Sequence, residues 1–227
     1  PVGKSCIFND TINSKIVPTT MLTDIFRYSS NGALFVATNV RQGMKFFDRE
    51  DDLVKIKDNV VTVGKNYKFI QTEEIFDELV KQYINLLKKG YKIKDIMCLS
   101  AFNVGEHGSY EINNAIQSEV NSLKPNEKTL EREISRIKIA FRLGDMIINK
   151  KNNYKAMPLD SYKMIEESDG VLKQDDVTLT SIFNGQCGNI IDIDEKKCIV
   201  KMDEEMIVFD KMTLKNLLLA YCISVHS

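Results

Sequence analysis

The chain lacks the cysteine patterns of zinc-binding or disulfide-stapled proteins. Its five cysteines are an odd number, are widely spaced and include no Cys-x-x-Cys pair, and only two histidines are present. A structural zinc site needs closely spaced Cys or His ligands, and a disulfide framework needs an even set of cysteines. The sequence therefore predicts no metal site and no disulfide framework.

The chain also lacks an excess of one charge and any long apolar run. Its 31 basic and 32 acidic residues give a formal net charge of -1. This excludes a protein that binds nucleic acid through net positive charge alone, but it permits a local nucleic-acid-binding groove. Neither end carries a charged-then-apolar leader, and no run is long enough to span a bilayer. We therefore expect a cytoplasmic protein with no membrane partner.

The chain has 227 residues, of which 43% are apolar, and this is enough to bury a core. Thr72 can cap a helix that ends near Gly90, with Ile75 and Tyr83 on its apolar face. The run 96–102 is almost wholly apolar and of strand length, which is typical of a strand covered on both faces. A helix followed by a buried strand predicts a parallel α/β sheet.

Two further helices are expected on either side of this unit. Residues 110–120 follow a polar, Gly-containing loop and place apolar residues on one helical stripe. Residues 31–41 carry Ala33, Ala37 and Val40 at helical spacing, and a glycine follows as a stop signal. Both patterns favour amphipathic helices packed on a sheet.

The period changes beyond about position 135. Short strands are expected at 137–141, 189–193, 198–202 and 206–209. Charged turns join the last three, which predicts a small antiparallel barrel or meander. The segment 155–181 has no firm period and is interpreted as an inserted loop. Residues 213–219 are expected to form a short helix that leads back to the first domain.

A possible phosphate-binding signal occurs at Gly3-Lys4-Ser5, because a P-loop ends in Gly-Lys-Ser or Gly-Lys-Thr. A P-loop also needs a preceding strand and an earlier glycine, and only Pro1 and Val2 precede this motif. A self-contained nucleotide-binding enzyme built on these residues is therefore the least favoured interpretation.

Motifs at both ends of the chain point to a family. Residues 1–3 and 22–27 read Pro-Val-Gly and Leu-Thr-Asp-Ile-Phe-Arg, and residues 220–227 read Ala-Tyr-Cys-Ile-Ser-Val-His-Ser. They resemble the Pro-Val-Gly-x-Gly, Leu-Thr-x-Ile-Phe-Arg and Ala-Tyr-Ala-Ile-Thr-Val-His-Lys-Ser-Gln-Gly runs of RecD-like superfamily 1 DNA helicases, the family of the exodeoxyribonuclease V alpha subunit. Ser5 departs from the family's usual Gly.

The resemblance implies an α/β fold with a RecA-like parallel sheet that has helices on both faces, plus an inserted small antiparallel β-barrel of Src-homology-3 type. It implies that the chain is a fragment of the C-terminal, second motor domain. That domain would comprise residues 1–134 and 213–227. The barrel would comprise residues 135–212, with a loop insertion at about 155–181.

The resemblance assigns a catalytic role to Arg27, at the ATP cleft. In the family the matching arginine reaches the γ-phosphate, and a planar, permanently charged guanidinium suits the negative charge that spreads there during transfer. An arginine in this role contributes roughly three to five orders of magnitude in turnover. Without the resemblance, a solvated or salt-bridged arginine at a helix end would be the favoured interpretation.

The loop that precedes the helix at 110–120 is a candidate for single-stranded DNA binding. A Gly-containing loop that opens onto a helix N-terminus presents unpaired N–H groups and a partial positive charge, which suits a phosphate. The loop resembles the family's Pro-x-x-x-Gly-x-x-Gly-Thr segment, and this implies DNA contacts by Asn103, His107, Ser109 and Asn113. The alternative is a plain helix cap formed by Ser109, with His107 exposed.

Weaker DNA-binding candidates lie in the barrel and at the chain's end. Asn152 and Tyr154 belong to an Asn-Asn-Tyr run that resembles the family's, and they suit hydrogen bonding and base stacking. Asn184-Gly185 belongs to a similar Phe-Asn-Gly motif, for which turn chemistry alone is the favoured interpretation. His226 opens the motif that couples the ATP cleft to the DNA strand in the family.

The activity implied by the resemblance is ATP-dependent DNA unwinding by the intact parent, with ATP and Mg²⁺ as cofactors that this fragment alone does not bind. The implied partners are single-stranded DNA, the N-terminal motor domain of the same protein and other recombination subunits. A non-enzymatic α/β module that presents a small barrel to a protein partner is the alternative of a different class.

Overall fold

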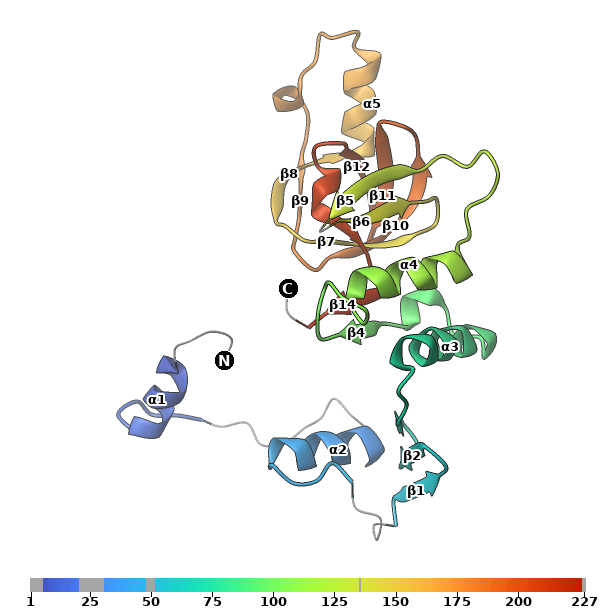
Figure 1. Ribbon diagram of the computed structural model, residues 1–227. Coiled ribbons are helices and arrows are strands. Elements are labelled where there is room, and N and C mark those ends of the chain that lie inside the picture. Colours follow the sequence, from blue (N-terminus) through green and yellow to red (C-terminus); the bar gives the residue numbers. More distant parts are fainter. Residues whose placement is uncertain (1–5, 21–30, 48–51, 135, 226–227) are drawn as a thin grey trace. The chain divides into compact units, whose positions relative to one another are not determined.

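The computed structural model describes residues 6–20, 31–47, 52–134 and 136–225. The chain divides into two compact units, Pro1–Thr72 and Glu73–Ser227 (Figure 1). No helix among the described residues is both long and apolar enough to cross a membrane.

The described residues of the N-terminal unit form two helices and a three-stranded antiparallel sheet. These are α1 (Ile7–Ser14), α2 (Asn31–Arg41), β1 (Val54–Lys57), β2 (Val60–Val63) and β3 (Tyr67–Ile70). The sheet was not expected from the sequence, because its strands are only four residues long and lie among charged turns.

The predicted helix at 31–41 is confirmed, but its predicted apolar face is wrong. Val36 is buried with Val61 and Val63, whereas Ala37 and Val40 are exposed. The reason is a close approach of the helix start to the sheet. A Cβ added to Gly32 would lie 1.8 Å from the carbonyl oxygen of Val63, so this contact fixes which side of α2 faces β2.

The first part of the C-terminal unit is a small lobe of helices and two strands, which we call the α/β lobe (residues 73–121 and 222–225). It contains α3 (Ile75–Lys88), the short η1 (Ile93–Asp95), β4 (Cys98–Ser100), α4 (Ser109–Val120) and β14 (Cys222–Ser224). Both predicted helices are confirmed, although α3 begins at Ile75 and has Glu74, not Thr72, as its N-cap.

The two strands of the α/β lobe run parallel. Cys222, Ile223 and Ser224 lie opposite Cys98, Leu99 and Ser100. The expectation that β4 is covered on both faces is wrong for the described residues, because Leu99 is 60% exposed. The wider RecA-like sheet with helices on both faces stays a prediction.

The remainder of the C-terminal unit is a curled antiparallel sheet with the strand order β13-β7-β10-β11-β12-β8-β9. Its strands are β7 (Met146–Asn149), β8 (Asn153–Pro158), β9 (Thr180–Ile182), β10 (Cys187–Ile193), β11 (Lys197–Met202), β12 (Glu205–Asp210) and β13 (Leu217–Leu219). A separate hairpin joins β5 (Leu130–Ile134) to β6 (Ile137–Phe141). The predicted antiparallel strands are confirmed, and closure into a Src-homology-3 barrel stays a prediction.

Two segments differ from their predicted form. Residues 155–181, expected as an irregular loop, include much of β8, the helix α5 (Leu159–Glu167) and the short η2 (Gln174–Asp176). Residues 213–219, expected as a helix, form η3 (Leu214–Asn216) and then β13, because Leu217 and Leu219 alternate toward the core beside β7. The predicted domain boundaries near 135 and 213 stay a proposal, and the β5–β6 hairpin spans the first of them.

Candidate nucleic-acid interface

Two of the predicted site residues, Arg27 and His226, lie outside the described residues. The other predicted residues fall at two places in the C-terminal unit. Asn103, His107, Ser109 and Asn113 lie in and after the loop between β4 and α4, and Asn152 and Tyr154 lie at the start of β8.

The loop between β4 and α4 is closed by its own hydrogen bonds. The N–H groups of Gly108, Ser109 and Tyr110 donate to the carbonyl oxygens of Gly105, Phe102 and Asn103, at 2.7, 2.9 and 3.2 Å. Since these three donors at the helix start already have partners inside the loop, they do not form the unpaired N–H cradle that the sequence suggested.

Ser109 and Asn103 are bonded to each other. Ser109 Oγ lies 3.1 Å from Asn103 Oδ1, to which it donates, and Ser109 is almost fully buried. The N-cap of α4 is Gly108, and no side chain caps the helix, so the alternative of a Ser109 cap is wrong as well. These two residues therefore fix the shape of the loop and leave little of Ser109 for a ligand.

His107 is exposed, but its surroundings are acidic. A hollow of about 410 Å³ beside it is lined by His107, Ile75, Phe76 and the carboxylates of Glu73, Glu74, Asp77, Glu106 and Glu111. Clustered carboxylates repel a phosphate backbone, and the effect is strongest at low salt. The electrostatics on this side of the loop therefore oppose a direct phosphate contact at His107.

Asn113 is buried, with 3% of its surface exposed, and its side chain forms hydrogen bonds to the backbone. Its Nδ2 donates to the carbonyl oxygens of Ser109 and Cys222, at 2.7 Å each, and its Oδ1 accepts from the N–H of Cys222 at 2.9 Å. Asn113 thus holds α4 against β14 and thereby supports the loop that precedes α4.

The pair at the start of β8 has a different environment. Tyr154 is 66% exposed, and its ring meets that of Phe183, which is 51% exposed, edge to face at 6.3 Å between centroids. Asn152 Nδ2 lies 3.4 Å from the Tyr154 hydroxyl, to which it donates, and its Oδ1 accepts from the N–H of Asn184 at 2.8 Å. We call Tyr154 and Phe183 the aromatic pair.

A buried asparagine holds the two loops that carry the aromatic pair. Asn149 Nδ2 donates to the carbonyl oxygens of Lys151 and Phe183, at 2.7 and 2.9 Å. Sequence reasoning treated the Phe183 motif as turn chemistry and did not include Phe183 among the site residues. The available signal was a large aromatic residue next to an Asn-Gly turn. A side chain beside a tight turn lies at the surface, so an aromatic ring there is a candidate for binding.

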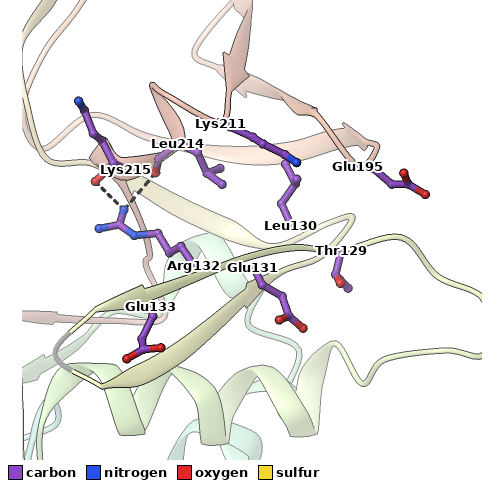
Figure 2. A pocket seen from close by; sticks show the side chains of 9 residues that line it. All are labelled: Thr129, Leu130, Glu131, Arg132, Glu133, Glu195, Lys211, Leu214 and Lys215. Carbon is purple, nitrogen blue, oxygen red and sulfur yellow. Dashed lines mark hydrogen bonds between the residues drawn. The ribbon is translucent and has the colours of Figure 1, made fainter.

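Another hollow, of about 600 Å³, lies between the β5–β6 hairpin and η3 (Figure 2). Its charged lining residues are Glu131, Arg132, Glu133, Glu195, Lys211 and Lys215. Figure 2 shows Arg132 turned toward η3, where its Nη1 donates to the carbonyl oxygens of Leu214 and Lys215, and a third bond reaches that of Leu217. The guanidinium therefore stabilises the η3 turn, and the hollow has no excess of positive charge.

No group of three or more His, Cys, Asp or Glu side chains in the described part of the chain is arranged to hold a metal ion.

No family model matches the chain. Among solved structures it is similar to unliganded Pif1 from Bacteroides sp., at 14% identity over 70% of this chain and 42% of that chain, with a TM-score of 0.33. It is also similar to Bacteroides sp. Pif1 in complex with ADP-AlF4, at 16% identity, 69% and 40% coverage and a TM-score of 0.31. A structure of two coordinating Pif1 helicases at forked double-stranded DNA matches at 14% identity, 69% and 38% coverage and a TM-score of 0.30. The chain thus spans less than half the length of these helicases.

Proposed function

We propose that the chain is part of the second motor domain of a RecD-like, ATP-dependent DNA helicase and that it supplies a binding surface for single-stranded DNA. The order of the sequence motifs from Pro1 to His226 supports the family. The aromatic pair at the end of the curled sheet, with Asn152 beside it, is the observation that carries the DNA-binding part of the proposal.

Two exposed rings beside amide groups suit unpaired bases. Every base has an aromatic face, so stacking on Tyr154 or Phe183 tolerates any sequence and contributes roughly 1 to 3 kcal/mol per base. Asn152 adds hydrogen-bonding capacity next to the ring, and Lys151 and Lys155 are exposed neighbours in the sequence that suit backbone phosphates. This arrangement favours a single strand over a duplex, whose bases are already stacked.

In this proposal the loop between β4 and α4 has a secondary part. His107 and Asn103 contact bases of the strand and not its phosphates, since the carboxylates around His107 oppose a phosphate contact, while Ser109 and Asn113 hold the loop in place. The aromatic pair supplies most of the affinity.

The ATP-dependent part of the proposal rests on the sequence motifs. Arg27 acts at the γ-phosphate and His226 couples the cleft to the DNA strand, while the phosphate-binding loop and the Mg²⁺ ligands come from the N-terminal motor domain of the parent. The parent then works in the cytoplasm, where other recombination subunits are its expected partners.

Fluorescence anisotropy with a labelled oligothymidylate tests the DNA-binding surface. We expect weak binding that falls as salt rises, since only part of a strand's channel is proposed here. Tyr154→Ala and Phe183→Ala should each weaken binding about tenfold, in line with the loss of about 1.4 kcal/mol of stacking. Tyr91→Ala is the matched control, because Tyr91 is 54% exposed but follows α3, and it should leave affinity unchanged. Equal effects of all three variants would refute the assignment.

A protein-binding module is the second candidate, and the hollow beside Arg132 favours it. Three acidic and three basic side chains line this hollow, which suits the mixed charges of a polypeptide better than a phosphate backbone. Absence of any binding to oligothymidylate, together with capture of a protein partner that Lys211→Glu abolishes, would favour this candidate.

A further inference from the structure

A buried carboxylate joins three segments of the C-terminal unit. Asp145 lies in the turn between β6 and β7 and is 0% exposed. Its Oδ2 accepts from Gln117 Nε2 at 2.6 Å and from the Arg142 N–H at 2.7 Å, and its Oδ1 accepts from Asn121 Nδ2 at 2.7 Å and from the Tyr221 hydroxyl at 2.9 Å. The donors come from α4 and its C-cap, from the turn itself and from the residue before β14.

The charge of Asp145 is not balanced by a basic side chain among the described residues. None of the ion pairs there includes it, and the Arg142 guanidinium donates to the carbonyl oxygen of Asn121 instead. Burial raises the pKa of Asp145 even though four hydrogen bonds oppose that rise. A buried carboxylate without a basic partner lowers the stability of the fold. We therefore look for the role of Asp145 in the arrangement of the segments that it joins.

The backbone of the same residue belongs to the curled sheet. The carbonyl oxygen of Asp145 accepts from the N–H of Ile190 in β10 at 3.0 Å, and the neighbouring Gly144 N–H donates back to Ile190 at 2.8 Å. Asp145 is therefore attached to the sheet by its main chain and to the α/β lobe by its side chain.

Both parts that Asp145 joins carry proposed DNA contacts. The sheet carries the aromatic pair at the ends of β8 and β9. In the α/β lobe, α4 starts directly after the loop that holds His107, and Tyr221 directly precedes β14, which leads toward His226. Figure 1 shows the lobe with α4, β4 and β14 below the sheet, with the chain passing between them at β14.

We propose that Asp145 is a positioning residue that holds the curled sheet and the α/β lobe in one orientation, so that the aromatic pair and the loop before α4 bind the same single strand of DNA. This inference rests on the proposed DNA-binding function. Its measurable consequence is avidity: a strand long enough to reach both parts gains from an effective concentration that depends on their fixed geometry.

The test compares the dissociation constants of the full chain for a short and a long oligothymidylate, of about 6 and about 20 nucleotides, which bracket the usual site size of one small binding domain. In the wild-type chain the long strand should bind at least about tenfold more tightly than the short one. Tyr221→Phe removes one donor to Asp145, and Asp145→Asn replaces one acceptor oxygen by a donor. Both should reduce the long-to-short ratio to less than about threefold.

Tyr83→Phe is a matched control for Tyr221→Phe. The two rings meet edge to face at 6.4 Å between centroids, and the Tyr83 hydroxyl is buried without a hydrogen-bond partner among the described residues, so its removal should leave the ratio unchanged. Partial unfolding of a variant weakens both oligonucleotides equally and therefore does not alter the ratio. If Asp145→Asn does not fold, Tyr221→Phe alone decides the outcome.

The results separate the inference from the function on which it rests. Unchanged ratios in Tyr221→Phe and Asp145→Asn, with wild-type binding intact, overturn the positioning role alone. Failure of the wild-type chain to bind either oligonucleotide overturns the DNA-binding function, and the positioning role with it.

Discussion

Asn113 on α4 pairs with the peptide groups of Cys222 on β14 as a neighbouring strand would. Its Nδ2 donates to the Cys222 carbonyl oxygen and its Oδ1 accepts from the Cys222 N–H, across 109 positions of sequence. A polar side chain thus satisfies the backbone hydrogen bonds of Cys222 and fixes the position of α4 relative to the parallel strands β4 and β14.

Asn113→Ala should destabilise the C-terminal unit by about 3 kcal/mol, because it leaves the buried N–H and C=O of Cys222 without partners. Asn114→Ala, one position along α4, removes a single bond to Lys138 and should cost about 1 kcal/mol or less. Urea denaturation followed by circular dichroism gives both values. Similar costs for the two variants would mean that Asn113 does not hold β14.

Gly188→Ala should also destabilise the C-terminal unit strongly. A Cβ at Gly188 would lie 2.5 Å from the carbonyl oxygen of Lys201 and 2.8 Å from side-chain atoms of Met202 and Val200, so β10 and β11 would have to separate. We expect a loss of about 2 kcal/mol or more. Asn189→Ala, at an exposed position of the same strand, is the control and should change the melting temperature little. A melting temperature for Gly188→Ala equal to that of the control contradicts the close packing.

The five cysteines should differ widely in their reaction with iodoacetamide. Burial raises the pKa of Cys98 to about 11 and the pKa values of Cys198 and Cys222 to about 12, whereas Cys6 is exposed. At pH 8 a thiol with a pKa of about 11 is only about one-thousandth thiolate, and the thiolate is the reactive form. Peptide mapping by mass spectrometry should find Cys6 modified first, and Cys98, Cys198 and Cys222 modified only after denaturation. Rapid native modification of Cys222 would show that the β4–β14 pair opens.

The pH dependence of stability should carry a signature of Asp145. Burial raises its pKa in the folded state above the unfolded value, so its favourable contribution is complete below the unfolded pKa of about 3.8 and is lost as pH rises through the folded pKa. The groups that face it are Gln117, Asn121, the Arg142 N–H and the Tyr221 hydroxyl, and none of them titrates in this range. The unfolding free energy of wild type, relative to that of Asp145→Asn, should therefore fall as pH rises from about 3.8 and then level off. A shift of opposite sign, measured by urea denaturation from acid to neutral pH, refutes the burial argument.

The chain alone should not hydrolyse ATP, since the phosphate and Mg²⁺ ligands are proposed to lie in the N-terminal motor domain. Phosphate release above background from the purified chain would count against the proposal. When the chain is joined to that domain, Arg27→Ala should lower kcat by about three orders of magnitude or more while DNA affinity changes little. Arg41→Ala, an arginine at the end of α2, is the control. Equal losses of turnover and affinity contradict the cleft role.

Local patterns were reliable guides to individual elements. The apolar stripe that contains Ile112 and Ile116 predicted α4, and the short apolar runs at 198–202 and 206–209, bounded by charged turns, predicted β11 and β12. These elements follow from patterns that a short window of sequence contains: a helical stripe for α4, and short apolar runs for the two strands. The same logic failed for α2, where the approach of Gly32 to Val63 decided the buried face.

The sequence by itself determined the helices and strands with a clear pattern and the motif order that suggests a helicase. The parallel pairing of 98–100 with 222–224 came from the tertiary structure. Only the tertiary structure decided which polar residues are free to bind a ligand. Asn113 and Asp145 are bonded to partners 109 and 76 positions away, and Phe183, which follows β9, meets Tyr154 in β8. Hydrogen bonding and ring contact act over a few ångströms in space, whereas a sequence pattern reports only neighbours along the chain.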